Sequence, residues 1–175
     1  MAASDQSGPV QAAVLVPLLL PAGAERPHVV LTLRRADLRR HAGEISFPGG
    51  RRDPGDADLR ETALREAQEE IGLPRSAVTV LGELPATSTF ATNYLIHPFV
   101  GLLRSELRWQ ASPREVAAVL ELPLAELAGA RTRTQMTRRG FTFETDVYML
   151  GEHLIWGATA RILDQLLERI DVFLP

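Results

Sequence analysis

The sequence predicts an α/β fold in which a mixed β-sheet is sandwiched between helices. Apolar segments of strand length recur along the chain and are bounded by turn residues. Two longer segments, one central and one terminal, carry apolar residues at helical spacing. The 175 residues contain no repeat and no interdomain linker. We therefore expect a single domain over residues 9–175, preceded by a polar, disordered N-terminus at residues 1–8.

The expected strands are apolar runs that end at turn residues. They cover residues 10–20, 28–34, 44–47, 78–83, 89–103, 116–122 and 141–150. The run at residues 89–103 is long, and we expect it to bend near Pro98. A short helical turn is expected at residues 124–128, and a closing amphipathic helix at residues 157–170.

The central helix is predicted over residues 58–71, and both of its ends carry sequence signals. Asp58, with Glu61 three residues later, resembles a capping box, although Ser or Thr is the usual first residue. Gly72 fits the position just after the last turn, where a left-handed backbone is common. These boundaries fix which residues of the helix share a face.

Three carboxylates gather on one side of this helix. Glu66 and Glu70 lie nearly in line along it, and Glu69 flanks them. A solvated acidic face is the ordinary alternative, but like charges four residues apart destabilise a helix by roughly 0.2–0.5 kcal/mol, and a bound cation would reverse that sign. The ligands would all be oxygens, and the chain has no cysteine, which favours Mg²⁺ or Mn²⁺ over Zn²⁺.

The segment around these carboxylates resembles the Nudix box, G-x5-E-x7-R-E-U-x-E-E-x-G-U, in which U is a bulky apolar residue. The second half matches, apart from a small residue at the first U, and reads Arg65-Glu66-Ala67-Gln68-Glu69-Glu70-Ile71-Gly72-Leu73. The first half departs from the pattern. Counted from Gly50, Asp56 stands where Glu is usual, and one extra residue lies before Arg65.

That departure is itself similar to the coenzyme A pyrophosphatase branch of the family, which has G-G-x-x-D-x-x-D followed by T-A-L-R-E-A-x-E-E. The same branch carries an upstream motif, L-L-T-x-R-[S/A]-x3-R-x3-G-x3-F-P-G-G. Its counterpart here is Val30-Leu31-Thr32, Arg34, Arg35, Arg39, Gly43 and Phe47-Pro48-Gly49-Gly50. Val30 is a mild change, whereas Arg35 replaces a small residue and adds a charge near the expected substrate path.

The resemblance implies a Nudix α/β/α sandwich and a metal-dependent site. The implied metal ligands are Glu66, Glu69, Glu70 and the carbonyl of Gly49, and the implied catalytic residues are Glu66, Glu69, Glu70, Arg65 and Glu115. Glu115 resembles the later carboxylate that many members use as a ligand or general base; Glu144 and Asp146 are alternatives. Arg65 can hold neighbouring carboxylates in place. The expected substrate-binding residues are Arg34, Arg39, Gly49, Gly50, Arg51 and Tyr94.

The implied reaction is hydrolysis of the diphosphate of coenzyme A, and of its acyl or oxidised forms, to 4′-phosphopantetheine and adenosine 3′,5′-bisphosphate. One alternative is a Nudix hydrolase of another nucleoside diphosphate derivative, such as ADP-ribose. Another is a nucleotide-binding regulator without catalysis, although such loss usually removes the box carboxylates. Phe90, Tyr94 and Trp156 could stack on an adenine or line the channel for the pantetheine arm, but aromatic residues more often belong to the core.

Composition narrows the partners and the compartment. The net charge is −3, so no overall field attracts nucleic acid or an anionic membrane. The apolar run at residues 10–20 is too short to span a bilayer and follows no basic segment. We expect a cytoplasmic protein whose partner is a small nucleotide, and we leave a homodimer open. Every basic residue is arginine, so each basic phosphate contact would come from a guanidinium group.

Overall fold

The computed structural model describes residues 8–24, 26–103 and 107–170. In chain order the elements are β1 (Val10–Leu19), β2 (His28–Arg34), β3 (Ile45–Ser46), β4 (Gly49–Arg51), α1 (Leu59–Ile71), a 3₁₀ turn η1 (Arg75–Ala77), β5 (Val78–Glu83), β6 (Thr87–Ser88), β7 (Tyr94–Leu103), β8 (Val116–Pro123), α2 (Leu124–Gly129), β9 (Arg131–Arg138), β10 (Phe141–Leu150), β11 (His153–Ile155) and α3 (Gly157–Ile170). The N-terminus expected to be disordered lies outside the described residues, apart from Gly8.

The central sheet is mixed, and it is split beside its middle strand. β1 runs parallel to β7 along one edge. Along its other edge β1 pairs with β2 only at Leu18 and Leu19. Beyond that point the two strands separate, and β4 pairs with β1 while β3 pairs with β2. The N–H of Leu15 donates to the carbonyl of Pro48 at 2.9 Å within this gap. The glycine pair that follows Pro48 is therefore held in the sheet rather than in a free loop.

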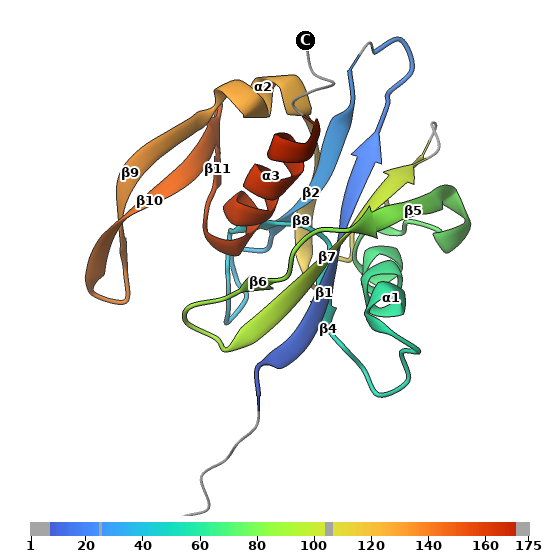
Figure 1. Ribbon diagram of the computed structural model, residues 1–175, viewed down its shortest axis with the longest axis horizontal. Helices are drawn as coiled ribbons and strands as arrows, with labels where there is room; N and C mark the ends of the chain where they lie inside the picture. Colours follow the sequence, from blue (N-terminus) through green and yellow to red (C-terminus); the bar gives the residue numbers. More distant parts are fainter. Residues whose placement is uncertain (1–7, 25, 104–106, 171–175) are drawn as a thin grey trace, which may run out of the picture.

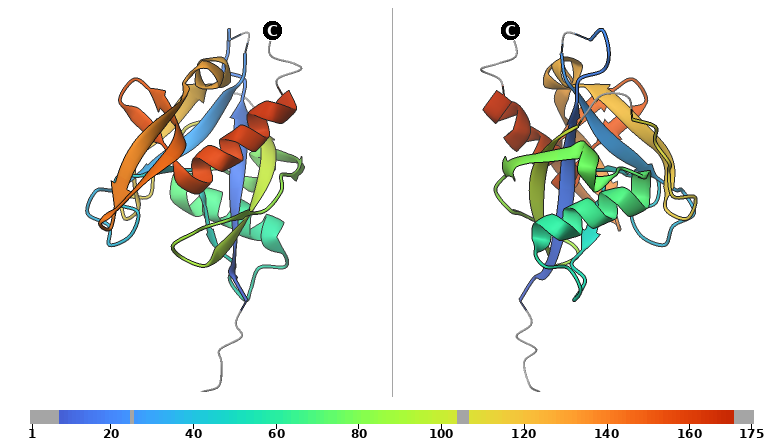
Figure 2. Two further views of the ribbon diagram at one scale, coloured as in Figure 1. Left: turned by 60° about the vertical axis from the view of Figure 1, so that its left-hand side comes forward. Right: turned by 90° about the vertical axis from the view of Figure 1, so that its right-hand side faces the viewer.

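Helices cover both faces of this sheet, which confirms the predicted α/β/α sandwich (Figures 1 and 2). On one face α1 buries an apolar stripe against β1 and β4. The stripe consists of Ala63, Leu64, Ala67 and Ile71. On the other face α3 buries Ile162, Leu163 and Leu166 in a separate core that also takes in α2. β1 supplies apolar side chains to both cores, which explains its nearly continuous hydrophobic sequence.

A smaller antiparallel sheet, β9–β10–β11, lies beside the sandwich. Only β10 was predicted. β9 was missed because most of its side chains are polar and exposed, so its sequence has no apolar alternation. The sheet is tied to α3 because the hydroxyl of Tyr148 donates to Asp164 at 2.5 Å and Arg131 pairs with the same carboxylate at 3.3 Å. This attachment holds β9 and β10 against the middle of α3, and β11 is paired with β10.

The predicted strand at residues 89–103 was wrong at its beginning. Residues 89–93 form a turn, and β7 starts at Tyr94. The hydroxyl of Thr89 accepts the N–H of Tyr94 at 3.0 Å, and Asn93 has a φ of 51°. Asparagine tolerates this left-handed backbone better than most residues, so it was the missed signal. Among the described helices, none has the length and apolar character needed to cross a membrane.

Candidate active site

The caps of α1 fix the orientation of its carboxylate face. Asp58 Oδ1 accepts the N–H of Glu61 at 2.8 Å, as predicted. Gly72 has a φ of 69°, and its N–H donates to the carbonyl of Gln68 at 3.0 Å. Both predicted ends are confirmed. The helix thus presents Glu66 and Glu70 beside the glycine pair and Glu69 toward Arg65, while its apolar stripe faces the sheet.

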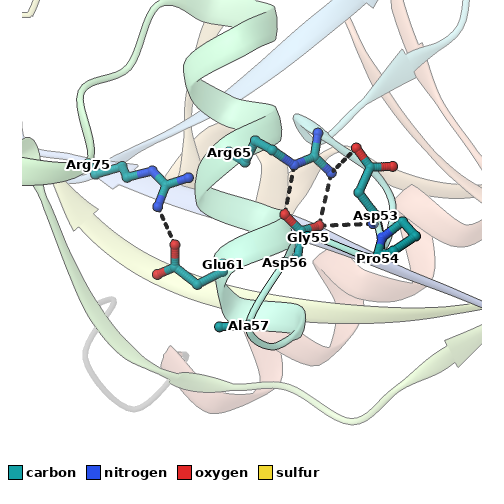
Figure 3. Close-up of a pocket in the computed structure, with 8 residues that line it drawn as sticks. All are labelled: Asp53, Pro54, Gly55, Asp56, Ala57, Glu61, Arg65 and Arg75. Atoms are coloured by element: carbon teal, nitrogen blue, oxygen red, sulfur yellow. Dashed lines mark hydrogen bonds and ion pairs between the residues drawn. The ribbon is translucent and has the colours of Figure 1, made fainter.

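Arg65 is held by Asp56, a residue of the loop before α1 (Figure 3). Arg65 Nε donates to Asp56 Oδ1 at 2.9 Å, and Nη2 donates to Oδ2 at 3.0 Å. The Thr62 hydroxyl and the Asp53 N–H also donate to Oδ2, at 2.8 and 3.0 Å. The guanidinium and these donors hold the pKa of Asp56 well below its usual range, so this buried carboxyl remains ionised.

The same guanidinium reaches two carboxylates of α1. Arg65 Nη1 donates to Glu66 Oε1 at 3.1 Å and to Glu69 Oε2 at 3.3 Å. Nη2 also donates to the carbonyl of Arg51 at 3.3 Å. Arg65 therefore has the contacts expected of a residue that positions carboxylates, and its contribution to catalysis stays a prediction.

An open hollow adjoins this ion pair (Figure 3). Its lining consists of Asp53, Pro54, Gly55, Asp56, Ala57, Glu61, Arg65 and Arg75. Glu61 and Arg75 form an ion pair across part of it. Glu66 and Glu70 do not line the hollow, so it belongs to the loop that anchors Arg65 and is separate from the carboxylate group.

Glu70 is the most buried carboxylate of the group, with 3% of its surface exposed. Burial, together with the charges of Glu66 and Glu115, raises the pKa of Glu70 to about 8. Arg34 and the N–H of Gly49 oppose this rise only in part. Burial also raises the pKa of Glu66, and Glu115 adds to that rise. Glu115 was predicted from the sequence, and the structure brings its charge close to the two helix carboxylates.

The two glycines lie in close packing. A Cβ on Gly50 would lie 2.5 Å from Glu66 Oε1. A Cβ on Gly49 would overlap the backbone of Ala13 and Val14. A side chain at Gly49 would overlap backbone, so glycine is required there, whereas a side chain at Gly50 would displace the carboxylate of Glu66. The role of the Gly49 carbonyl as a metal ligand stays a prediction.

The oxygen donors near Gly49 have the chemistry that a divalent cation needs, but their side chains are not arranged around one point. Within residues 8–24, 26–103 and 107–170, no three carboxylate or imidazole side chains converge closely enough to enclose a metal ion. Glu66 and Glu69 instead turn toward Arg65. The donors nevertheless are oxygens only. Burial first, and then the charges of Glu66 and Glu115, raise the pKa of Glu70, and a bound cation would oppose this rise. The ligand set of Glu66, Glu69, Glu70 and Gly49 therefore stays a prediction.

Arg34 approaches the carboxylates from the end of β2. Its charge acts on Glu70, and its Nε is buried without a hydrogen-bond partner in the described part of the chain. A buried donor left unpaired costs about 1–3 kcal/mol, and more when it is charged. A phosphate oxygen bound here would supply the missing acceptor.

Three predicted substrate-binding side chains are not brought to the carboxylates. Arg39 is exposed in the loop between β2 and β3, and the side chain of Arg51 is also exposed. Tyr94 is half-buried at the start of β7, opposite Val10. For the residues that the structure describes, no hydrogen bond or ion pair joins these three side chains to Glu66 or Glu70. Their role in binding stays a prediction.

Arg35 is engaged by protein atoms rather than left free near the substrate path. Its Nε and Nη2 donate to the Asp37 carboxylate at 2.8 and 2.7 Å, and Nη1 donates to the Pro113 carbonyl at 2.5 Å. Its backbone N–H donates to the carbonyl of Glu115 at 3.0 Å. Arg35 thus ties the β2–β3 loop to the segment that carries Glu115.

Replacing Arg35 with alanine is expected to lower kcat by about tenfold, because a catalytic group displaced by a fraction of an ångström loses much of its effect. The KM should change little, since Arg34 and the glycine pair stay in place. Arg35→Lys should recover part of the loss, because an ammonium group can still donate to Pro113. Kinetics on the best diphosphate substrate, with thermal unfolding alongside, test this. The exposed Arg60→Ala is the control, and an equal loss there would contradict the positioning role.

Comparisons with known proteins agree with this geometry. The NUDIX domain family model matches residues 9–144. The chain is 41% identical over 163 residues to an uncharacterized Nudix hydrolase NudL from Photorhabdus laumondii, covering 92% of this chain and 85% of that protein. A NudL from Salmonella paratyphi B is 41% identical over 164 residues, with coverage of 93% and 83%.

Solved structures share the fold at low sequence identity. The Nudix hydrolase RenU from M. smegmatis has a TM-score of 0.64 at 19% identity, covering 96% of this chain and 89% of RenU. The NUDIX domain of Shewanella oneidensis NrtR, complexed with ADP ribose, has a TM-score of 0.58 at 17% identity, with coverage of 94% and 90%. On the family match, its extent and the identity to the NudL proteins, this chain belongs to the Nudix hydrolase family.

Proposed function

We propose that this Nudix hydrolase cleaves the diphosphate of coenzyme A, including its acyl or oxidised forms, into 4′-phosphopantetheine and adenosine 3′,5′-bisphosphate. The main support for the proposal comes from the position and surroundings of Arg34. It belongs to the upstream motif of the coenzyme A branch, its charge reaches Glu70 of the box, and its Nε is buried without a partner in the described residues. The two motifs therefore meet at one place, where a diphosphate oxygen would complete the hydrogen bonding.

The irregular half of the box also supports this substrate. Asp56 is shorter than the usual Glu, and one extra residue separates it from Arg65, yet it holds Arg65 through two hydrogen bonds. The loop with the changed spacing therefore still holds Arg65 in place. It follows the pattern of the coenzyme A branch, which is why we favour that substrate over others of the family.

The residues have distinct parts in the proposed reaction. Mg²⁺ or Mn²⁺ held by Glu66, Glu69, Glu70 and the Gly49 carbonyl would neutralise the diphosphate and lower the pKa of a water. Arg34 binds a phosphate oxygen, and Arg65 keeps Glu66 oriented. Glu115 takes the proton from the attacking water, because it is exposed while its charge acts on Glu66 and Glu70. Its segment is anchored to α1, since the Ser112 N–H donates to the Glu70 carbonyl at 2.7 Å.

A second candidate substrate is ADP-ribose. The NrtR domain with the same fold is described in complex with ADP ribose, and Arg35 departs from the coenzyme A motif. The engagement of Arg35 by Asp37 and Pro113 weakens this argument, because its charge is already used within the protein. Coenzyme A therefore stays the first choice.

The test is to incubate the protein with coenzyme A, ADP-ribose and a diadenosine polyphosphate, each in Mg²⁺ and in Mn²⁺, and to identify the products by mass. We expect coenzyme A to be hydrolysed fastest, with both named products formed in equal amounts. Much faster cleavage of ADP-ribose would overturn the assignment. Tight nucleotide binding with no phosphate-bond cleavage in either metal would instead indicate a regulator.

A further inference from the structure

A second hollow lies between the β2–β3 segment and the small sheet. Part of its lining is apolar and comes from Leu33, Ile45 and Leu154. The half-buried ring of Trp156 also lines it, and the guanidinium carbon of Arg138 lies 4.7 Å from the ring centroid. The hollow thus combines a flat aromatic face, a guanidinium and an apolar lining. The proposed phosphate chemistry does not use any of these groups.

The hollow is close in the chain to the phosphate-binding groups. Leu33 immediately precedes Arg34, and the carbonyl of Glu44, another lining residue, accepts the Arg34 N–H at 2.9 Å. Ile45 is four residues before Gly49, so their Cα atoms are at most roughly 14 Å apart. Leu33 packs on the α3 side of the sheet while Arg34 acts on Glu70 on the α1 side, so a nucleotide with its diphosphate at Arg34 would reach the hollow around the end of β2, where Glu44 lies.

The chemistry of the lining favours a nucleobase as that end. Every base has a π-face that stacks on an aromatic side chain, and arginine adds a cation–π contribution. Two carboxylates, Glu44 and Glu152, also line the hollow. They repel phosphate groups, and they can accept hydrogen bonds from an exocyclic amino group. A flexible pantetheine arm can also donate hydrogen bonds to these carboxylates, but it has no ring to stack on Trp156.

We propose that this hollow is the binding site for the purine ring of the substrate's nucleotide half, with the base stacked on Trp156 and Arg138 contributing from its guanidinium. The identity of that nucleotide as adenosine 3′,5′-bisphosphate rests on the proposed function. The site itself rests on the Trp156–Arg138 pair and on two further lining residues, Leu33 and Glu44, that adjoin Arg34. Trp156 and Arg138 are then substrate-specificity residues rather than parts of the hydrolytic group.

Direct binding tests the site without any turnover. The full chain contains two tryptophans, so a Trp109→Phe background leaves Trp156 as the fluorescent reporter. Adenosine 3′,5′-bisphosphate should quench this fluorescence as it binds. In calorimetric titrations with the same ligand, Trp156→Leu and Arg138→Ala should each weaken binding by about tenfold, in line with the usual loss of one base–aromatic stack. Because Arg138 is exposed, its variant should fold even if Trp156→Leu does not.

The matched control is Arg161→Ala, which removes the guanidinium of another aromatic pair. Phe90 and Arg161 form the same kind of stacked pair at 4.8 Å, but neither lines the hollow. This variant should bind the bisphosphate as the parent protein does. Unchanged binding in Arg138→Ala, together with no quenching of Trp156, would overturn the proposal. So would a loss confined to 4′-phosphopantetheine, because it would place the other half of the substrate in the hollow.

The two proposals fail in different ways. If coenzyme A is not cleaved but the bisphosphate still binds through Trp156 and Arg138, the base site stands and the coenzyme A assignment fails. If coenzyme A is cleaved and its KM is unchanged in both variants, the assignment stands and the base site fails.

Discussion

Replacing Glu70 with glutamine is expected to lower turnover by about a hundredfold or more while the fold is kept. Glutamine has nearly the same shape, but its amide carries no charge and is a poorer ligand for a hard divalent cation. Glu70 is only 3% exposed, and Gly49 and Gly50 pack closely beside the helix carboxylates. Another side chain therefore has little room to take its place.

The same substitution is expected to raise the free energy of unfolding of the metal-free protein. The pKa of Glu70 is raised from 4.5 to about 8, first by burial and then by Glu66 and Glu115. A group with a raised folded-state pKa contributes stability below its unfolded pKa and loses it as the pH rises through the folded value. The advantage of Glu70→Gln should therefore grow between pH 4.5 and about 8 and then level off. Glu70→Gln should thus lower the turnover and raise the free energy of unfolding of the metal-free protein.

Urea unfolding in EDTA at acidic, neutral and alkaline pH measures the difference in free energy of unfolding between the parent and Glu70→Gln. Product assays in Mg²⁺ measure turnover. Glu126→Gln, the same chemical change at an exposed position on α2, is the control and should alter neither. Addition of Mg²⁺ should stabilise the parent more than Glu70→Gln, because stabilisation by a bound ligand grows with the logarithm of its affinity. Near-parental turnover in Glu70→Gln would rule out Glu70 as a metal ligand.

The parts of the site that the sequence predicted are local ones. The caps of α1, the shared face of Glu66, Glu69 and Glu70, and the need for Gly49 and Gly50 all follow from spacing within a short segment. Helical periodicity and capping chemistry determine such features almost without reference to the rest of the chain.

The parts that could not be predicted depend on distant contacts. β9 has no apolar pattern, and it is a strand because β10 pairs with it along its whole length. Arg35 was expected to add a charge near the substrate path, and the sequence gives no sign that Pro113, which lies 78 residues away in the chain, accepts its hydrogen bond. The stacking of Arg138 on Trp156 is likewise a tertiary contact, which no local motif encodes. In the sequence, Asp56 is a departure from the general Nudix box. Its role in holding Arg65 follows from two hydrogen bonds that only the fold reveals.

Replacing Asp56 with asparagine is the second change with a large expected effect. It should lower the free energy of unfolding by about 2–4 kcal/mol at neutral pH, because a buried charged pair is broken while the guanidinium remains. The Asp56 side chain is 6% exposed, and that of Arg65 is 19% exposed. Turnover should fall as well, since Arg65 would no longer be fixed where it orients Glu66. Urea unfolding and kinetics on the same preparation measure both effects.

Asp53→Asn is the matched control. Asp53 also pairs with Arg65, but at 3.7 Å and with its side chain 64% exposed. Exposed pairs contribute about 0–1 kcal/mol, so this variant should be close to the parent in stability. A similar loss in the two variants would mean that the loop as a whole, and not the buried carboxylate, supports Arg65.

The pH dependence separates the charge of Asp56 from its shape. The guanidinium of Arg65, with the Thr62 and Asp53 donors, lowers the folded-state pKa of Asp56 below its ordinary 3.8. A lowered pKa contributes stability that is present above the unfolded value and is lost as the pH falls through the folded one. The gap between the parent and Asp56→Asn should therefore be widest at neutral pH and should narrow below pH 3.8. A gap that stays constant into acid would show that hydrogen-bond geometry alone, which asparagine disturbs at every pH, accounts for the loss.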